Sequence, residues 1–79
     1  MYQILIADDH PMIREAISRA IVESIPDCRV DETDSLEGAM AYSAEHPATD
    51  LVLLDLNMPG MDGLNGIVAM RNEHADIPV

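Results

Sequence analysis

The 79-residue sequence predicts an α/β domain, with an open parallel sheet that carries helices on both faces. Two observations lead to this prediction. Short apolar runs, typical of buried strands, recur along the chain. Between them lie segments in which apolar residues return every three or four positions, as they do on one face of a helix. The order is strand, helix, strand, helix, strand, helix and the start of a further strand.

The first pair of elements is a strand over "YQILIA" (residues 2 to 7) and a helix that begins at Pro11. Proline suits the first turn of a helix, with Asp9 or His10 near the cap position. The helix should end near Pro26. Its apolar stripe consists of Ile13, Ala16, Ile17, Ala20 and Ile21.

The second pair is a weaker strand over "CRVDET" (residues 28 to 33) and a helix after it. Apolar and charged residues alternate in this strand, which favours a place near the sheet edge. Asp34 or Ser35 can cap the helix, and Asp34 with Glu37 has the spacing of a capping box. The inner face of this helix is predicted to be Leu36, Ala39, Met40 and Ala44, with Ser43 between them.

The third pair begins with "LVLLDL" (residues 51 to 56), the most strand-like segment of the chain. "NMPGMDG" follows, and its proline and glycines predict a loop. A third helix should fade by Asn72, and "IPV" (residues 77 to 79) resembles the first residues of another strand. The apolar stripe of this helix begins with Leu64, Ile67 and Val68.

The composition argues against a nucleic-acid-binding, a disulfide-bonded or a membrane-spanning protein. The chain has fifteen acidic residues, four arginines and no lysine. The resulting net charge of -11 disfavours direct binding of nucleic acid. Cys28 is the only cysteine, which excludes an internal disulfide and suits the cytoplasm. No apolar run reaches the roughly 20 residues that cross a bilayer, so no membrane contact is expected. Phe and Trp are absent, and the methionines at 12, 40 and 70 are predicted to fill the core.

Carboxylates mark the ends of two of the predicted strands. Asp8 and Asp9 follow the first strand, and Asp55 lies near the end of the third. If these strands are neighbours, the three carboxylates meet at one crevice. Two unit charges about 4 Å apart repel by about 4 kcal/mol at an effective dielectric near 20, so the group demands a cation or a proton. Hard oxygen ligands favour Mg²⁺, and a carboxylate beside Mg²⁺ favours phosphate chemistry.

Simpler readings of the same residues stay open. A single Asp at a strand end is often a turn former or a helix cap, and the pair before Pro11 could serve only the helix dipole. The histidines at 10, 46 and 74 are expected to be loop residues. A calcium loop starting at Asp55 is excluded, because Pro59 and Gly66 occupy its fifth and twelfth positions.

Three stretches, "ILIADDHPMIREAI", the strand that holds Asp55 and "LNMPGMDGL", together resemble a bacterial response-regulator receiver domain of two-component signalling. The opening stretch is similar to the LuxR/NarL-type branch, in which a receiver joins a DNA-binding domain and regulates transcription. The resemblance covers residues 1 to 79 and implies a flavodoxin-like (CheY-like) fold of strand order 2-1-3-4-5. That order places the strands before Asp8 and Asp55 side by side.

The resemblance also implies roles for single residues. Asp55 would be the phosphoacceptor, taking a phosphoryl group from a sensor histidine kinase with Mg²⁺ as cofactor. Asp9 would bind the metal directly, Asp8 mostly through water, and the Asn57 backbone carbonyl would be a further ligand beside Asp55. The loop after the site would be shaped by Pro59, Gly60 and Gly63.

Against that family, the chain stops at the opening of the fourth strand. The Ser/Thr and Lys that accompany phosphorylation, the last two helices and the DNA-binding domain would lie beyond Val79. We therefore expect little stable phospho-aspartate, no enzyme activity of its own, and a homo-oligomer formed through the first helix and the edge of the third strand. The alternative is a non-phosphorylatable module used only for self-association. A haloacid-dehalogenase-type phosphatase is disfavoured, because it needs a second Asp where Asn57 stands.

Overall fold

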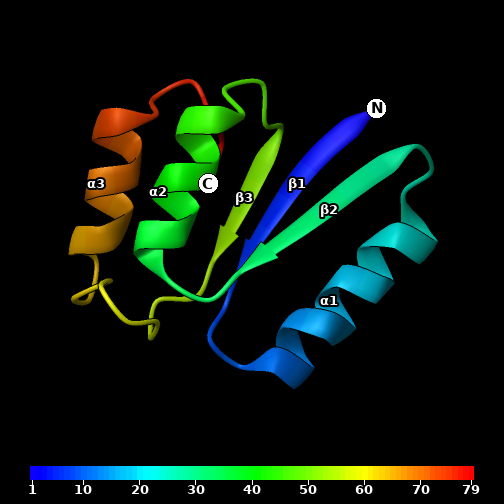
Figure 1. Ribbon diagram of the computed structural model, residues 1–79, viewed down its shortest axis with the longest axis horizontal. Helices are drawn as coiled ribbons and strands as arrows, with labels where there is room; N and C mark the ends of the chain where they lie inside the picture. The colour runs from blue at the N-terminus through cyan, green and yellow to red at the C-terminus, as the bar shows by residue number, and fades with distance from the viewer.

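The computed structural model describes residues 1–79, and its three strands form one parallel sheet of order β2-β1-β3 (Figure 1). β1 spans Tyr2–Ala7, β2 spans Cys28–Thr33 and β3 spans Leu51–Leu54. β1 pairs along its whole length with β2, and Ile4 to Ala7 pair with β3. The carboxyl ends of β1 and β3 therefore lie at the same edge of the sheet, and β2 is an edge strand as predicted.

The helices cover both faces of this sheet, as predicted. They are α1 (Pro11–Ser24), α2 (Leu36–Glu45) and α3 (Asn65–Glu73). Figure 1 shows α2 and α3 side by side and α1 apart from them, against β2. Successive side chains of β1 alternate between the two layers, as the period of a strand requires. No helix is long and apolar enough to pass through a membrane. The order β2-β1-β3 and the helices on both faces are those of the flavodoxin-like fold that the sequence predicts.

The core lies between the sheet and the α2–α3 layer. Methionines take the place of aromatic residues in it, but not all of the predicted ones. Met70 is fully buried and Met40 packs at the core margin, whereas Met12 is 85% exposed on α1, so its prediction as core filler was wrong. Met58 and Met61, from the loop after β3, are buried instead. The core cluster is Leu5, Ala7, Ala39, Val52, Met58, Met61, Met70 and Ile77.

Of the two predicted caps of α2, the structure has Ser35, and two further details of this helix differ from the prediction. The cap is Ser35, whose hydroxyl accepts from the Gly38 backbone N–H at 3.0 Å, so no Asp34–Glu37 capping box closes this helix. Ser43 is buried on the inner face and Ala44 is exposed. Ser43 is accommodated because its hydroxyl donates to the carbonyl of Ala39 at 2.8 Å, which satisfies a buried polar group.

The third predicted helix is shifted in phase. Leu64 and Val68 are more than half exposed, and Gly66 and Met70 face the core instead. The reason is the close packing of Gly66 on Met61, which leaves no room for a side chain at position 66. β3 ends at Leu54 rather than Leu56, because the chain turns after it.

The segment "IPV" is not a strand in the structure, although it lies beside β3. The Val52 N–H donates to the carbonyl of Pro78 at 2.8 Å, and Ile77 is buried. A cavity of about 570 Å³ opens along β3 next to this segment, with lining residues from both faces of the sheet. No residue of α1 is fully buried, and Ile13 is half exposed. Apolar surface is thus uncovered along β3 and α1, as expected.

Candidate metal centre

Backbone pairing fixes two acidic residues directly after neighbouring strands. The Asp8 N–H donates to the carbonyl of Thr33 at 3.0 Å, which extends the β1–β2 pairing by one residue. The Asp55 N–H donates to the carbonyl of Ala7 at 2.9 Å and extends the β1–β3 pairing in the same way. These bonds hold the two residues at the crevice where the strand order of the sheet reverses.

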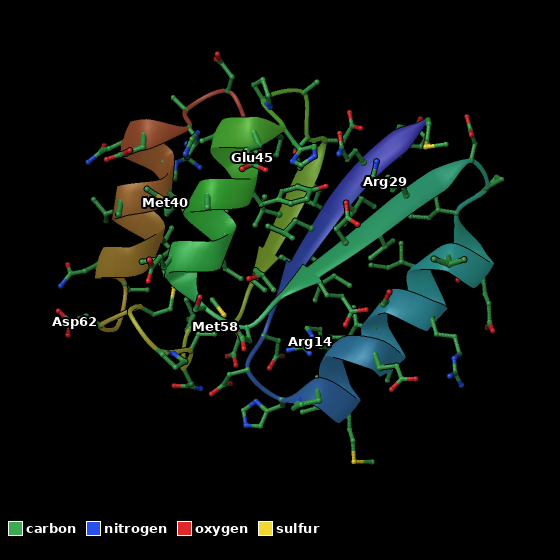
Figure 2. All side chains as sticks on the ribbon, in the orientation of Figure 1. Arg14, Arg29, Met40, Glu45, Met58 and Asp62 are labelled. Atoms are coloured by element: carbon green, nitrogen blue, oxygen red, sulfur yellow. The ribbon has the colours of Figure 1, made fainter.

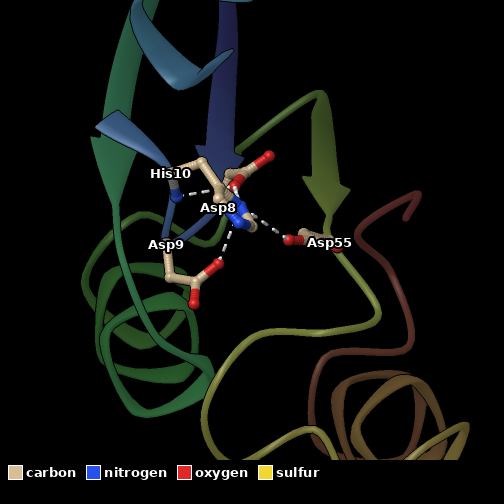
Figure 3. Close-up of side chains that lie close together, drawn as sticks. All are labelled: Asp8, Asp9, His10 and Asp55. Carbon is tan, nitrogen blue, oxygen red and sulfur yellow. Dashed lines mark hydrogen bonds and ion pairs between the residues drawn. The ribbon is translucent and has the colours of Figure 1, made fainter. Parts of the chain in front are cut away.

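Four side chains meet at this crevice: Asp8, Asp9, His10 and Asp55 (Figure 3). One potential ligand atom from each lies within 4.8 Å of all the others. The imidazole of His10 lies between the acids. Its Nδ1 is 3.0 Å from Asp8 Oδ1, 3.0 Å from Asp9 Oδ1 and 3.7 Å from Asp55 Oδ2. We call this group the Asp–His cluster.

The sequence prediction for this site is correct for the meeting of the three acids, and it did not anticipate the contacts of the His10 ring. Asp8, Asp9 and Asp55 are brought together, whereas His46 and His74 lie outside the cluster, as expected. His10 lies in the exposed loop before α1, as expected, and its ring contacts three carboxylates there. A histidine next to two acids at a strand end was the available signal.

Hydrogen bonds set the charge states inside the cluster. The His10 backbone N–H donates to Asp8 Oδ1 at 2.8 Å, which lowers the pKa of Asp8 in spite of the burial of its carboxyl. The bond between the His10 ring and Asp8, reinforced by the charge of Asp9, raises the pKa of the imidazole. An ionised Asp8 carboxylate and a protonated His10 ring therefore favour each other.

The chain reverses direction after Asp55, and Asn57 takes part in this turn. The Asn57 backbone N–H donates to Asp55 Oδ1 at 3.1 Å, so Oδ2 is the oxygen that faces His10. The role of the Asn57 carbonyl as a metal ligand stays a prediction. Gly60 and Gly63 have φ angles of 89° and 63°, in the left-handed region that glycine adopts without strain. The Pro59 carbonyl accepts from the Leu36 N–H at 3.4 Å, which ties the loop to α2.

Arg14 supports the cluster from α1, and the sequence reasoning did not single it out. Its Nη1 donates to the backbone carbonyl of Asp8 at 2.8 Å, and its Nε donates to Glu32 Oε1 at 2.9 Å. The guanidinium therefore joins the end of β1 to β2 without occupying the carboxylate of Asp8. Figure 2 shows Arg14 near the carboxyl ends of the strands. A cation one helical turn after Asp9 and His10 was the only hint in the sequence.

The donors of the cluster fit a divalent cation. Three carboxylates lie on a part of the surface with one histidine and no lysine, and their oxygens are close enough to share one ion. Asp8 is buried, while Asp9 and Asp55 are partly exposed, so an ion from solvent has access to the site. Oxygen donors of this kind suit Mg²⁺ or Mn²⁺.

Comparisons with known proteins match nearly the whole of this chain. The family model of the response regulator receiver domain matches residues 4–79. The glycerol metabolism activator of Pseudomonas putida is 53% identical over the whole chain, which spans 36% of that protein. The nitrate/nitrite response regulator NarL of Escherichia coli K12 is 40% identical over 70 residues, with 89% of this chain and 32% of that protein covered.

Solved structures show the same likeness. The signal receiver domain of the putative response regulator NarL from Mycobacterium tuberculosis has a TM-score of 0.78 and 35% identity, over 98% of this chain and 60% of that one. A structure of RcsB dimers bound to DNA has a TM-score of 0.79 and 25% identity, over 98% of this chain and 40% of that one. The chain spans about a third of the length of the curated relatives it matches.

Proposed function

The chain belongs to the response-regulator receiver family, and from that premise we propose that Asp55 accepts a phosphoryl group in two-component signalling. Asp8, Asp9, Asp55 and the Asn57 backbone carbonyl would hold the Mg²⁺ ion that this reaction needs. The observation that carries the proposal is the meeting of Asp55 with the acids that follow β1. A single Asp at a strand end would equally serve as a turn former, but three carboxylates at one crevice need a counter-ion.

The orientation of Asp55 suits a nucleophile. Its Oδ1 is engaged by the Asn57 N–H, whereas Oδ2 points into the cluster, and its side chain is 20% exposed. In the proposed step, one carboxylate oxygen of Asp55 forms a bond to the phosphorus of a phosphohistidine on a sensor kinase while the P–N bond breaks. The kinase imidazole keeps the electron pair and takes a proton from solvent, and Asp55 becomes an acyl phosphate. The bound cation would neutralise charge on the phosphoryl oxygens.

The proposed role is that of a signal acceptor rather than an enzyme. The relatives named above are regulators, and RcsB binds DNA as a dimer. The net charge of -11 opposes contact with phosphate backbones, so we propose that these 79 residues make no DNA contact themselves. DNA contact would come from another part of a regulator that contains this domain, with the cytoplasm as the place of action.

Phosphorylation can be tested with acetyl phosphate and Mg²⁺, using rapid quenching and intact mass. Since the chain has no lysine to pair with the phosphoryl group, we expect a short-lived adduct of one phosphoryl group per chain. Asp55→Asn should abolish it, and Asp76→Asn, at an exposed acid outside the cluster, should not. Equal labelling without Mg²⁺, or in the Asp55→Asn variant, would contradict the proposal.

Self-association is a second candidate function, favoured by the cavity along β3. Its lining is mostly apolar and includes Leu53, Leu56 and Ile17. Contiguous apolar surface beside a strand edge that is paired only at Val52 is the kind of surface that pairs with another chain. A module of this kind would need neither metal nor phosphoryl group, so a phosphate analogue that binds only together with Mg²⁺ would favour the acceptor role.

A further inference from the structure

We propose that His10 is a direct metal ligand and that it gives the Asp–His cluster a preference for transition-metal ions over Mg²⁺. The inference rests on the proposed function, because it assumes a cation at the carboxylates of Asp8, Asp9 and Asp55. It goes beyond that function by adding a nitrogen donor to a site that oxygen donors alone would define.

The spacing of the donor atoms is compatible with ligands on one ion, and it is equally that of the hydrogen bond and ion pairs that the ring makes with the acids. Two ligand atoms that each lie about 2.1 Å from a metal are about 3.0 Å apart when the angle between their bonds is 90°. The His10 Nδ1 is 3.0 Å from one oxygen of Asp8 and 3.0 Å from one oxygen of Asp9, with Asp55 Oδ2 at 3.7 Å. Figure 3 shows the ring directed into the space between these acids rather than away from them.

The backbone holds His10 in this position at both of its polar groups. Its N–H donates to Asp8 Oδ1 at 2.8 Å, and its carbonyl accepts from the Arg14 N–H at 2.9 Å in the first turn of α1. Pro11 then fixes the start of the helix. The ring itself is 59% exposed, so water and ions reach it freely. A fixed backbone with an accessible ring suits a ligand that takes an ion from solvent.

The nitrogen donor makes the expected effect selective. Imidazole binds Co²⁺, Ni²⁺ and Zn²⁺ well, whereas Mg²⁺ prefers oxygen and keeps several of its waters. Cys28 begins β2 opposite Tyr2, at the other end of the sheet from the cluster, and so adds no thiolate. The selectivity of this centre would therefore depend on His10.

A competing possibility makes the opposite prediction. The protonated ring could act only as an occupant that neutralises the carboxylates and must leave before an ion binds. In that case removal of the ring would strengthen the binding of every divalent cation. If His10 is a ligand, removal of its ring should weaken the binding of ions that accept nitrogen ligands and leave the binding of other ions unchanged.

The test compares Co²⁺ and Mg²⁺ binding to the whole chain at one pH by calorimetry, together with the visible absorption of bound Co²⁺. Loss of groups that merely support a metal ligand typically weakens affinity 10–100-fold, so His10→Ala should weaken Co²⁺ binding at least about tenfold. It should leave Mg²⁺ affinity nearly unchanged and alter the Co²⁺ spectrum. His74→Ala is the matched control, because His74 lies outside the cluster, and it should change neither quantity.

Each other outcome overturns the inference. An equal loss for both ions would make His10 a structural residue, and a gain for both would make it an occupant. An Asp9→Ala variant distinguishes a failure of the His10 proposal from a failure of the proposed metal centre. If Asp9→Ala abolishes binding of both ions while His10→Ala has no effect, only the inference fails. If neither ion depends on Asp9, the metal centre itself is wrong.

Discussion

The guanidinium of Arg14 donates to the backbone carbonyl of Asp8 across 2.8 Å, so α1 is attached directly to the residue that begins the Asp–His cluster. The same side chain is bonded to Glu32 on β2 and is only 21% exposed. The position of the Asp8 carboxylate therefore depends on a helix that buries none of its own residues completely. Arg14 compensates in part for the weak packing of α1.

Removal of this arginine should loosen both the helix and the site. We expect Arg14→Ala to lower the free energy of unfolding by about 1–2 kcal/mol, as expected for two hydrogen bonds of a partly buried group. Arg19→Ala is the matched control, because its ion pair with Glu15 is exposed and should contribute less than about 0.5 kcal/mol. Urea denaturation measures both. Equal effects of the two variants would show that the contact with Asp8 contributes nothing.

Stability should depend on pH through His10. Contact with Asp8 raises the imidazole pKa above its ordinary 6.5, so the protonated ring stabilises the folded state. That contribution is complete below pH 6.5 and is lost as the pH rises through the raised pKa. Between pH 6 and pH 9 the melting temperature should fall less in His10→Ala than in the unaltered chain. A His74→Ala variant should keep the full slope, and identical slopes in all three would contradict the prediction.

At acid pH the change should come from Asp8 instead. Its pKa lies below the ordinary 3.8, chiefly because of the His10 backbone N–H. Its contribution is therefore present above pH 3.8 and is lost as the pH falls through the lowered pKa. Since the main donor is backbone, His10→Ala should leave much of this acid transition in place.

Substitution of Gly66 by alanine is expected to lower the stability of the protein, although a Gly→Ala substitution within a helix usually raises it. Gly→Ala within a helix ordinarily stabilises by about 1 kcal/mol. A Cβ at position 66, however, would lie 2.9 Å from the Met61 Cα and 2.5 Å from its Sδ. We expect Gly66→Ala to cost about 1–3 kcal/mol in urea denaturation, as overpacking does. Val68→Ala, at an exposed position of the same helix, should cost much less. A Gly66→Ala chain as stable as the original would disprove the close packing.

Self-association should follow the cavity along β3. At tens of micromolar protein we expect a dimer or higher oligomer, favoured by salt because salt screens the repulsion between chains of charge -11. Leu56→Glu, within the lining of the cavity, should shift the chain toward monomer. Leu64→Glu, at an exposed leucine outside it, should not. Light scattering behind a sizing column at two salt concentrations measures this, and a well-folded monomer at both would exclude the prediction.

The parts of the structure that follow from local pattern could be predicted from the sequence. β1 and β3 are apolar runs followed by acids, β2 alternates apolar and charged residues, and the meeting of Asp8, Asp9 and Asp55 follows once β1 and β3 are neighbours. The parts that depend on packing could not. The sequence does not show that Met61 and Gly66 contact each other, because one lies in a loop and the other in a helix. Met12 is an apolar residue of the kind found in cores, but it lies on a face of α1 that no other element covers.

His10 shows the same limit at the site. Its type and position fit a helix cap, and it does lie at the cap position of α1. Its side chain makes no cap hydrogen bond, however, because three carboxylates attract the ring from the other side. Asp8 and Asp9 are neighbours of His10 in the sequence, but the third carboxylate, Asp55, comes from another strand and is not part of any local pattern.

The central claim is that Asp8, Asp9 and Asp55 form one divalent-metal centre, and Mn²⁺ titration followed by amide NMR tests it most directly. The account predicts paramagnetic broadening that begins at residues 8–10 and 55–57, weak affinity, and competition by Mg²⁺. Asp9→Ala should weaken binding more than Asp8→Ala, and Asp76→Ala, outside the cluster, should not weaken it. Broadening spread evenly over the acidic residues of the surface, unchanged by Asp9→Ala, would contradict the account.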